Sequence, residues 1–590
     1  MKQQAFRIAE HQTVERILNA YVRESGSRLT FSAEDYYTDD RANWMILELP
    51  KQKCKLLGTI TYFSEFGHHH YGEKFWLIQP DQSIEPVDSA IRLAEMIVEE
   101  IDTDPESGNK EELLSNIQNS MEKTALYLEK ALHQPQKDGW GLDREERLRW
   151  MEQRLLLGHP FHPTPKSSEG FTNEDLQKYA PELQAAFPLH FFAIHPDWIE
   201  EDWTSDIALS NDQLFPSEVC RQLKDFISEG YRLFPMHPWQ AEYVLKYDVW
   251  QKGVKQGKIV NLNRLGPDVF PTSSVRTVWS PHFPYTVKLP LHVRITHFVR
   301  ENTPEQVERS IDASRVITHL RKTWTYPSLT VLAEVGSLQF RPPKSVHANG
   351  YPLAASNVLL RENPDLSGGR VPLVVASLLE RWPNQSEPPV FAAIRQAAGV
   401  PAGKIPDLKL AEWLNKYLEI TLIPVLELFA DEGVSLEAHV QNSMMHLENG
   451  WPDHFYVRDL EGVSISKDTA RTKGYVGSLL TPDSPVLYTE EKAWERLQYY
   501  FIVNHLGHLI YVLSYYGKWS EKEAWGVVRR LLEKQQPSAS PRMRTYIDRL
   551  LQTPTLRAKA NLISRFQNRA DSAIYVDLPN PIISSEVKVK

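Results

Sequence analysis

An alternating run near the middle of the chain constrains its fold more than any other feature. From Tyr285 to Thr296, apolar and polar residues alternate without a break. Because successive side chains of a β-strand point to opposite faces, a period of two predicts a strand with one buried face. The polar face of this strand would carry Lys288, His292 and Arg294, while the Pro inside the run favours an edge strand or a bulge.

A shorter extended run, residues 273–278, precedes this strand and places Ser274 and Arg276 on one side. The segment between the two runs is rich in Pro and Ser, so we expect them to pair as a hairpin. Arg grips carboxylate or phosphate through two parallel bonds, and Lys supplies a point charge, so the shared face suits an anion. Taken singly, each cation on a strand's outer face is more often an ordinary solvated charge. Their convergence favours the anion site.

The alternation stops after Thr296. If the chain turns helical there, Thr296 and Arg300 fall four residues apart on one side of the helix. A hydroxyl and a guanidinium would then join the same anion-binding neighbourhood.

Length and composition exclude several classes of protein. A chain of 590 residues is too long for one core, so we expect about three domains. The net charge of -10 argues against a nucleic-acid binder or a partner of anionic membranes. Only Cys54 and Cys220 are present, so no disulfide framework or Cys-based zinc site is offered. No run of about 18 apolar residues occurs, and residues 1–25 lack a signal-peptide core, so we expect a cytoplasmic protein.

Two histidine-containing segments stand out. Three adjacent histidines in FGHHHYG, residues 66–72, invite a metal site, but neighbours on a strand face opposite sides, so a hairpin turn is the stronger interpretation. The segment GHPFHPTPKSSEGF, residues 158–171, is dense in Pro and Gly and predicts a loop of fixed shape. His159, His162 and Lys166 on this loop could reach a phosphate or carboxylate.

A second candidate site lies in LEAHVQNSMMHLENGWPDHFYVRDLEG, residues 436–462. Three polar residues alternate with apolar ones and a fourth follows: Glu437, His439, Gln441 and Asn442. Asn449-Gly450 predicts a hairpin turn, and the returning strand leads to Asp459. Carboxylates and an amide oxygen are ligands that hold Mg²⁺ beside nucleotide phosphates. The alternative is an acidic rim on a solvated hairpin. The alternation of unusual polar types favours the Mg²⁺ site.

Five segments, in this order, resemble the NRPS-independent siderophore (NIS) synthetases, whose founding members are the aerobactin synthetases. These segments are GHPFHPTPKSSEGF, PTSSVRT, KLPLHVRITHFVREN, EAHVQN and RDLEG. The resemblance covers roughly residues 150–570. It implies an α+β enzyme of hand-like architecture. Its thumb would be residues 1–145, its fingers domain with an antiparallel sheet residues 146–395, and its largely helical palm residues 396–590.

The resemblance also implies a reaction in siderophore biosynthesis. A carboxylate of citrate, or of a citrate derivative, attacks the α-phosphate of ATP, and an amine or hydroxyl captures the acyl-adenylate to give an amide or ester with release of AMP and pyrophosphate. The alternatives are the same chemistry on 2-oxoglutarate or a monoacylated citrate, and a kinase-like phosphotransferase, which would release ADP. A homodimer is expected, with ATP and Mg²⁺ and without nucleic-acid or membrane partners.

Family roles carry over residue by residue. Phosphate-binding residues match Ser274, Arg276 and Lys288, and the loop that closes over the phosphates matches His162 and Lys166. Residues that bind the carboxylic acid match Thr296, Arg300, His439 and, at the C-terminus, Lys559. Nucleotide-side polar residues match Gln441 and Asn442, and the Mg²⁺ ligands match Glu437, Asn442 and Asp459. Catalysis is assigned to Arg276, Lys288 and His439, because preorganised charge must stabilise the phosphates as they react.

His439 has two possible roles. It could donate a hydrogen bond to the carboxylate and later to the oxyanion, or it could act as a base for the incoming amine. We expect the donor role, since neighbouring anions would raise its pKa and keep it protonated.

Overall fold

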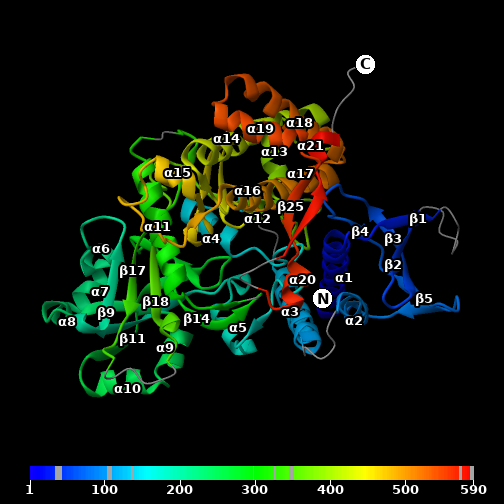
Figure 1. Cartoon of the computed structure of the whole chain (residues 1–590). Helices are drawn as coiled ribbons and strands as arrows, with labels where there is room; N and C mark the ends of the chain where they lie inside the picture. Colours follow the sequence, from blue (N-terminus) through cyan, green and yellow to red (C-terminus); the bar gives the residue numbers. More distant parts are fainter. Residues whose placement is uncertain are drawn as a thin grey trace.

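The computed structural model describes residues 1–32, 43–102, 109–134, 139–296, 298–323, 326–344, 351–569 and 574–584. Helices and mainly antiparallel sheets occur in all parts of the chain, which confirms the α+β class. Figure 1 shows three groups of elements: an N-terminal sheet at the right, a large sheet at the lower left and C-terminal helices at the top. None of the helices in these ranges combines the length and apolar character needed to cross a membrane.

The N-terminal part contains three helices and a six-stranded antiparallel sheet. Its elements are α1 (Lys2–Ser25), β1 (Leu29–Ser32), β2 (Asn43–Leu49), β3 (Cys54–Tyr62), β4 (His70–Tyr71), β5 (Phe75–Ile78), β6 (Ile84–Val87), α2 (Ala90–Ile101) and α3 (Asn109–His133). The FGHHHYG segment leads from β3 into β4, which pairs back antiparallel on β3, so the hairpin-turn interpretation is confirmed. In the described ranges, no three His, Cys, Asp or Glu side chains form a group that could hold a metal ion.

The middle part is built on an eight-stranded sheet in which every neighbouring pair is antiparallel. In spatial order its strands are β10 (Arg232–Met236), β8 (Phe187–Ile194), β11 (Ile259–Pro271), β12 (Thr277–Trp279), β13 (Tyr285–Lys288), β18 (Asn357–Glu362), β17 (Glu334–Phe340) and β9 (Ile199–Trp203). The expected hairpin is present, because β12 pairs with β13. The helices of this part are α4 (Arg144–Glu152), α5 (Asn173–Tyr179), α6 (Asn211–Leu214), α7 (Ser217–Gln222), α8 (Lys224–Ser228), α9 (Pro238–Val244), α10 (Asp248–Lys255) and α11 (Pro304–Leu320).

The long alternating strand is a prediction that the structure corrects. The run is split into β13 and β14 (Leu291–Ile295), and β14 belongs to a separate three-stranded sheet with β15 (Phe298–Arg300) and β7 (Ser168–Glu169). Pro290 lies at the break, where its ring removes a backbone donor that a continuous ladder would need.

The helix expected after Thr296 is also wrong. Thr296 has a positive φ of 60°, and the chain turns back so that β15 pairs antiparallel with β14. Since β-branched residues rarely adopt this conformation, the sequence alone gave no reason to expect it. Residue 297 lies outside the described residues.

The C-terminal part is mainly helical. Its helices are α12 (Val375–Leu379), α13 (Val390–Ala398), α14 (Asp407–Glu432), α15 (Lys467–Thr472), α16 (Glu490–Leu497), a π-helical segment (Gln498–Leu506), α17 (Gly507–Gly517), α18 (Glu521–Gln535), α19 (Pro541–Gln552), α20 (Asn561–Phe566) and α21 (Pro581–Ser584). The apolar spacing of residues 546–566 predicts a helix, but β25 (Thr555–Lys559) separates α19 from α20 and pairs with β26 (Tyr575–Pro579). Figure 1 shows β25 and α20 running from the C-terminal helices toward α1 and α3.

The predicted hairpin in this part is present. β21 (Ser443–Glu448) and β22 (Trp451–Val457) pair antiparallel inside a four-stranded sheet with β16 (Leu329–Val331) and β19 (Leu373–Val374). Asn449 and Gly450 form the turn with φ values of 50° and 83°. A Cβ on Gly450 would lie 2.1 Å from the carbonyl oxygen of Ala393, so this turn position requires glycine. A smaller sheet, β20 (Val434–Ser435), β23 (Ser464–Ser466) and β24 (Leu487–Tyr488), flanks the hairpin.

Two large apolar cores underlie these parts. One lies among the C-terminal helices and the β21–β22 hairpin, and the other is shared by the N-terminal helices and the eight-stranded sheet. The predicted division at residues 145 and 395 stays a prediction.

Candidate active site

The turn between β11 and β12 presents the predicted phosphate-binding residues. Its backbone is closed by hydrogen bonds from Val275 N to the Thr272 carbonyl and from Thr272 N to the Thr277 carbonyl, both 2.8 Å long. Val275 has a φ of 68°, which is strained for a β-branched residue. The turn directs Ser274 to its half-buried tip and sends Arg276 into the protein, where Arg276 is 5% exposed.

Arg276 links this turn to the end of β15. Its guanidinium donates to the carbonyl oxygens of Arg300 and Glu301, at 3.3 and 3.1 Å, and to the side-chain oxygen of Asn302. Glu461 lies 3.8 Å from the same guanidinium. Arg276 therefore sits between the two groups of residues that the sequence assigned to phosphate and carboxylate.

Lys288 does not lie on an open face, as the alternating pattern predicted. It is 2% exposed, because the turn that follows β22 covers that face of β13. Lys288 Nζ lies 2.6 Å from Asp459 Oδ1 and 2.9 Å from Glu461 Oε2. The predicted phosphate ligand and the predicted metal ligand are thus in direct contact across the two candidate sites.

Thr296 and Arg300 meet although the helix expected to join them is absent. Arg300 donates from Nη2 to Thr296 Oγ1 at 2.6 Å and from Nε to the Ile295 carbonyl at 3.2 Å. Among the described residues, no carboxylate lies within ion-pair distance of Arg300. Burial, and to a smaller extent the neighbouring charge of Arg276, lowers the pKa of Arg300 to about 10. A guanidinium that lacks a carboxylate partner at this distance suits an anionic ligand.

His439 lies between the hairpin and the C-terminal helices. Its Nδ1 accepts hydrogen bonds from the backbone N–H groups of Gln441 and Asn442, each at 3.3 Å. The ring proton of the neutral side chain therefore resides on Nε2, which lies 3.9 Å from a Glu437 carboxylate oxygen. The turn between β11 and β12 is called the phosphate turn below, after its predicted role. Gln441 reaches across to this turn and donates to the Ser273 carbonyl at 3.1 Å.

The expected pKa of His439 is corrected by the structure. Burial lowers the pKa of His439 below its usual value and outweighs the opposing effect of Glu437 and Asp459, so the side chain is neutral near pH 7. A neutral imidazole with Nδ1 already occupied still donates from Nε2. His439 can therefore still act as a hydrogen-bond donor, but as a neutral and not as a protonated side chain.

Lys559 is the last residue of β25. Its ammonium group donates to the Tyr500 hydroxyl at 2.5 Å and lies 4.7 Å from the centre of that ring. The Tyr500 and His439 rings are 6.0 Å apart, and Lys559 is close enough to His439 to affect its pKa. Lys559 therefore belongs to the same neighbourhood as His439.

The loop 158–171 was predicted to close over the phosphates with His162 and Lys166, and these two residues have different surroundings in the structure. Thr164 donates from its N–H to His162 Nδ1 at 3.1 Å and from its hydroxyl to the Thr296 carbonyl at 3.4 Å, so the His162 turn contacts a residue predicted to bind the carboxylic acid. Lys166 instead forms an ion pair of 2.5 Å with Glu182. Its side chain lines a small cavity of about 50 Å³ together with Ser273, so it lies beside the phosphate turn with its charge already neutralised.

The three predicted metal ligands offer a suitable donor set for Mg²⁺. Asn442 uses its amide nitrogen to contact the Glu437 carbonyl at 3.2 Å, which leaves its amide oxygen for a ligand. Asp459 contacts Lys288 and Arg361 through Oδ1, and within the described residues its second carboxylate oxygen makes no hydrogen bond or ion pair. Two carboxylates and an amide oxygen match the preference of Mg²⁺ for oxygen ligands.

Comparison with known proteins decides the family. A family model described as IucA / IucC matches residues 147–380, and one described as a ferric iron reductase FhuF-like transporter matches residues 411–574. The L-2,3-diaminopropanoate–citrate ligase of Staphylococcus aureus is 35% identical, over 97% of this chain and 96% of its own length. The chain belongs to the IucA/IucC family.

Further relatives of this IucA/IucC family member agree. The N(2)-citryl-N(6)-acetyl-N(6)-hydroxylysine synthase of Escherichia coli is 25% identical over 97% of each chain. The solved structure of ATP-bound aerobactin synthetase IucA from Klebsiella pneumoniae has a TM-score of 0.81 at 26% identity, covering 97% of this chain and 99% of that one. The NIS synthetase resemblance is confirmed, and the chain is an enzyme, a ligase of siderophore biosynthesis.

The reductase name of the second family model finds no support in the residues. Cys54 and Cys220 both lie outside the segment 411–574. That segment therefore supplies no thiolate ligand for an iron centre.

Three site residues of this IucA/IucC family member were missed by the sequence. Glu461 pairs with Lys288, and Arg361 and Glu334 form a buried ion pair of 2.9 Å beside Asp459. Glu461 could have been found from its place two residues after Asp459. Arg361 and Glu334 lie on strands with no motif nearby, so only the sheet register reveals them.

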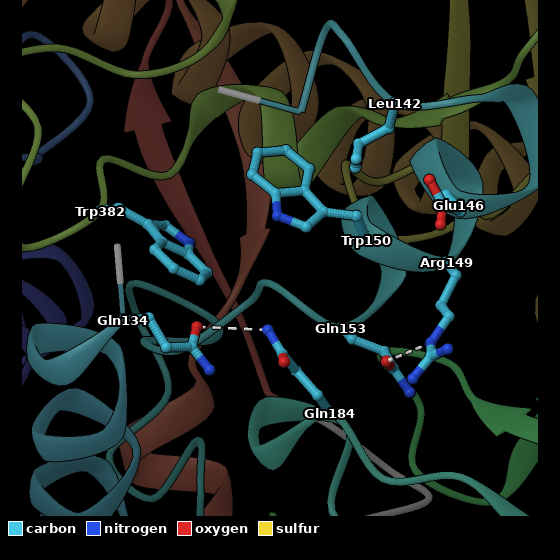
Figure 2. Close-up of a pocket in the computed structure, with 8 residues that line it drawn as sticks. All are labelled: Gln134, Leu142, Glu146, Arg149, Trp150, Gln153, Gln184 and Trp382. Carbon is cyan, nitrogen blue, oxygen red and sulfur yellow. Dashed lines mark hydrogen bonds between the residues drawn. The ribbon is translucent and has the colours of Figure 1, made fainter. Parts of the chain in front are cut away.

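A separate cavity of about 330 Å³ lies behind α4. Figure 2 shows the indole rings of Trp150 and Trp382 above the hydrogen-bonded amides of Gln134 and Gln184. None of the candidate site residues lines this cavity. Its link to the site is Gln153, which donates to the carbonyl oxygen of Pro271 at 3.4 Å, just before the phosphate turn.

Proposed function

We propose that this IucA/IucC family enzyme activates a carboxylate of citrate with ATP and transfers the citryl group to an amine. The carboxylate attacks the α-phosphate, the bond between the α- and β-phosphates breaks, and pyrophosphate leaves. The amine nitrogen then attacks the acyl carbon, loses a proton and displaces AMP, which leaves an amide. The observation that carries the proposal is the convergence of Arg276, Lys288 and Arg300 on one site beside Asp459.

In this proposal Arg276 and Lys288 serve the phosphates. Adenylation brings a carboxylate against a highly charged nucleotide, so fixed cations must offset the repulsion and the charge that builds up on the leaving pyrophosphate. Both side chains are buried and held by several partners, so little reorganisation is needed during the reaction. Lys288 exchanges its bonds to Asp459 and Glu461 for a phosphate oxygen when the nucleotide binds.

Arg300 and Thr296 hold the acid. Their mutual bond of 2.6 Å and the bond from Arg300 to the Ile295 carbonyl fix the guanidinium before the ligand arrives. Preorganisation of this kind reduces the entropy lost on binding and orients the reacting carboxylate. His439 donates from Nε2 to the oxyanion that forms during acyl transfer, and Lys559 adds positive charge nearby.

The metal site of the proposal consists of Glu437, Asn442 and Asp459. When bound, Mg²⁺ would neutralise phosphate charge beside these residues. Ser274, Gln441 and His162 contribute polar contacts from the nucleotide side, while Lys166 would first have to release Glu182.

The names of two relatives support an amine as the acceptor. The Staphylococcus aureus protein is named for L-2,3-diaminopropanoate and citrate, and a Bacillus anthracis relative at 27% identity is named for spermidine and citrate. We propose a primary amine of an amino acid or polyamine as the acceptor. The homodimer and the cytoplasmic location stay predictions.

Pyrophosphate release tests the proposal. We expect release that requires citrate and ATP, increases with L-2,3-diaminopropanoate or spermidine, and yields AMP rather than ADP. The same assay with 2-oxoglutarate, a monoacylated citrate or a hydroxyl nucleophile separates the alternative substrates. Formation of ADP would replace the ligase with a phosphotransferase.

A further inference from the structure

Arg361 and Glu334 form an ion pair in the floor of the site. They lie directly opposite each other on β18 and β17, and Arg361 Nε is 2.9 Å from Glu334 Oε1. Their exposed fractions are 3% and 0%. Since charges are costly to bury, a pair this deep requires good geometry and further hydrogen bonds.

The further bonds lead to the turn that carries Asp459. Arg361 Nη2 lies 3.4 Å from Asp459 Oδ1 and makes no hydrogen bond within the described part of the chain. Glu334 Oε2 accepts a bond from Leu460 N at 3.4 Å and one from the Ser314 hydroxyl at 3.3 Å. The ion pair thus contacts both the carboxylate of Asp459 and the backbone of the next residue.

The turn needs such support. Asp459 has a φ of 69°, a left-handed conformation that non-glycine residues adopt at some cost. Its carboxylate is shared between Lys288 and Arg361. When Lys288 turns to a phosphate, Arg361 is the cation that stays with Asp459, because Glu334 holds it in place.

We propose that Arg361, oriented by Glu334, is a positioning residue that fixes the Asp459 carboxylate for a divalent cation. The inference rests on the proposed function, in which Asp459 is a metal ligand. The Arg361 guanidinium already faces the carboxylates of Glu334 and Asp459, so it acts through Asp459 and not on the substrates. Partners of a metal ligand in this position typically change metal affinity by roughly 10- to 100-fold when they are replaced.

The test measures metal binding directly and uses the full chain. Mn²⁺ replaces Mg²⁺, and its binding with a non-hydrolysable ATP analogue is followed by electron paramagnetic resonance for wild type, Arg361→Lys and Asp459→Asn. Arg321→Lys is the matched control, because Arg321 pairs with Glu362, the next residue on β18, at 2.6 Å and is partly exposed. The Mg²⁺ dependence of pyrophosphate release and the melting temperature are measured for the same variants.

We expect Arg361→Lys to weaken Mn²⁺ binding by roughly tenfold or more and to raise the half-saturating Mg²⁺ concentration by a similar factor. The melting temperature and KM for citrate should stay close to those of Arg321→Lys. If Mn²⁺ binding by Arg361→Lys matches the control while Asp459→Asn is impaired, the inference is wrong and the metal site stands. If Asp459→Asn also binds Mn²⁺ normally, the metal assignment in the proposed function fails, and the inference with it.

A second variant, Glu334→Gln, tests the same inference if Arg361→Lys does not fold. Glu334→Gln keeps an acceptor for Leu460 N but removes the charge that orients Arg361. We expect it to weaken Mn²⁺ binding as well, by less than Arg361→Lys does. Unchanged binding in Glu334→Gln would overturn the role of the pair even if Arg361→Lys cannot be purified.

Discussion

Lys288 Nζ lies 2.6 Å from Asp459 Oδ1, although the two residues are 171 positions apart in the chain. Burial alone would raise the pKa of Asp459, but Lys288 and then Arg361 hold it well below its usual range. Asp459 is therefore ionised at any working pH. In the proposed reaction Lys288 serves a phosphate and Asp459 serves the metal ion, so the two residues neutralise each other until the ligand binds.

Replacing Lys288 should affect stability as well as activity. Lys288→Ala leaves Asp459 and Glu461 without their nearest cation in a buried site, so we expect a loss of about 3 kcal/mol or more in the free energy of unfolding together with loss of pyrophosphate release. Urea unfolding and the release assay measure the two effects. Arg294→Ala is the control, because its ion pair with Glu169 is about one-third exposed and should contribute about 0–1 kcal/mol. A variant as stable as wild type would contradict the buried pairing.

This outcome differs from what the sequence alone suggests. Period-two alternation predicted that Lys288 faces solvent, and such a residue could be replaced without harm to the fold. Alternation reports which residues share a face. It does not report that a turn more than 150 residues later covers that face, because this contact is non-local.

Other parts of the site show the same difference between local features, which the sequence predicts, and non-local contacts, which it does not. The hairpin turn at Asn449-Gly450 and the β12–β13 pairing follow from local turn chemistry, and the sequence predicted both. The positive φ angles at Val275 and Thr296 could not be predicted, because β-branched residues avoid them unless tertiary contacts impose them. Several residues that the motifs selected lie close together in the structure, while the helix proposed to join Thr296 and Arg300 is wrong.

His439 should act as a neutral donor. Glutamine can place an N–H near the position of Nε2. We therefore expect His439→Gln to be roughly tenfold or more as active as His439→Ala, which is the scale of one hydrogen bond to a charged group. Pyrophosphate release measures both variants. Equal loss in the two variants would favour a base instead.

The pH dependence gives an independent check on His439. Its pKa lies below the usual 6.5, so the side chain does not titrate between pH 7 and 8.5. The activity ratio of wild type to His439→Gln should therefore be constant over that range. A ratio that rises with pH would show that deprotonation of His439 matters there.

Glu24 should make stability depend on pH. This residue of α1 accepts hydrogen bonds from Leu562 N and Ile563 N at the start of α20, and burial raises its pKa to about 8. A carboxyl with a raised pKa binds its proton more tightly in the folded state, so its contribution is complete below about pH 4.5 and is lost as pH rises toward 8. The loss is at most about 1.4 kcal/mol per pH unit.

Glu24→Gln tests this assignment. The difference in unfolding free energy between wild type and Glu24→Gln should fall steadily from pH 5.5 to 8 and then level off. Glu48→Gln, at an exposed position on β2, is the control, and its difference from wild type should stay flat. Parallel curves for wild type and Glu24→Gln would remove Glu24 as the titrating group.

Arg300 should determine how well the acid binds. Its Nη2 and Nε are fixed by Thr296 Oγ1 and the Ile295 carbonyl, which orients the remaining N–H groups toward a ligand carboxylate. Arg300→Lys keeps the charge but loses the planar fork, so we expect the KM for citrate to rise by roughly tenfold or more, about 1.4 kcal/mol. The KM for ATP should change little, because Arg276 and Lys288 remain.

Arg294→Lys, on the adjacent strand and paired with Glu169, should change neither constant. Steady-state kinetics with each substrate varied in turn decides the matter. An equal rise in both KM values would show that Arg300 serves the nucleotide or the fold instead of the acid.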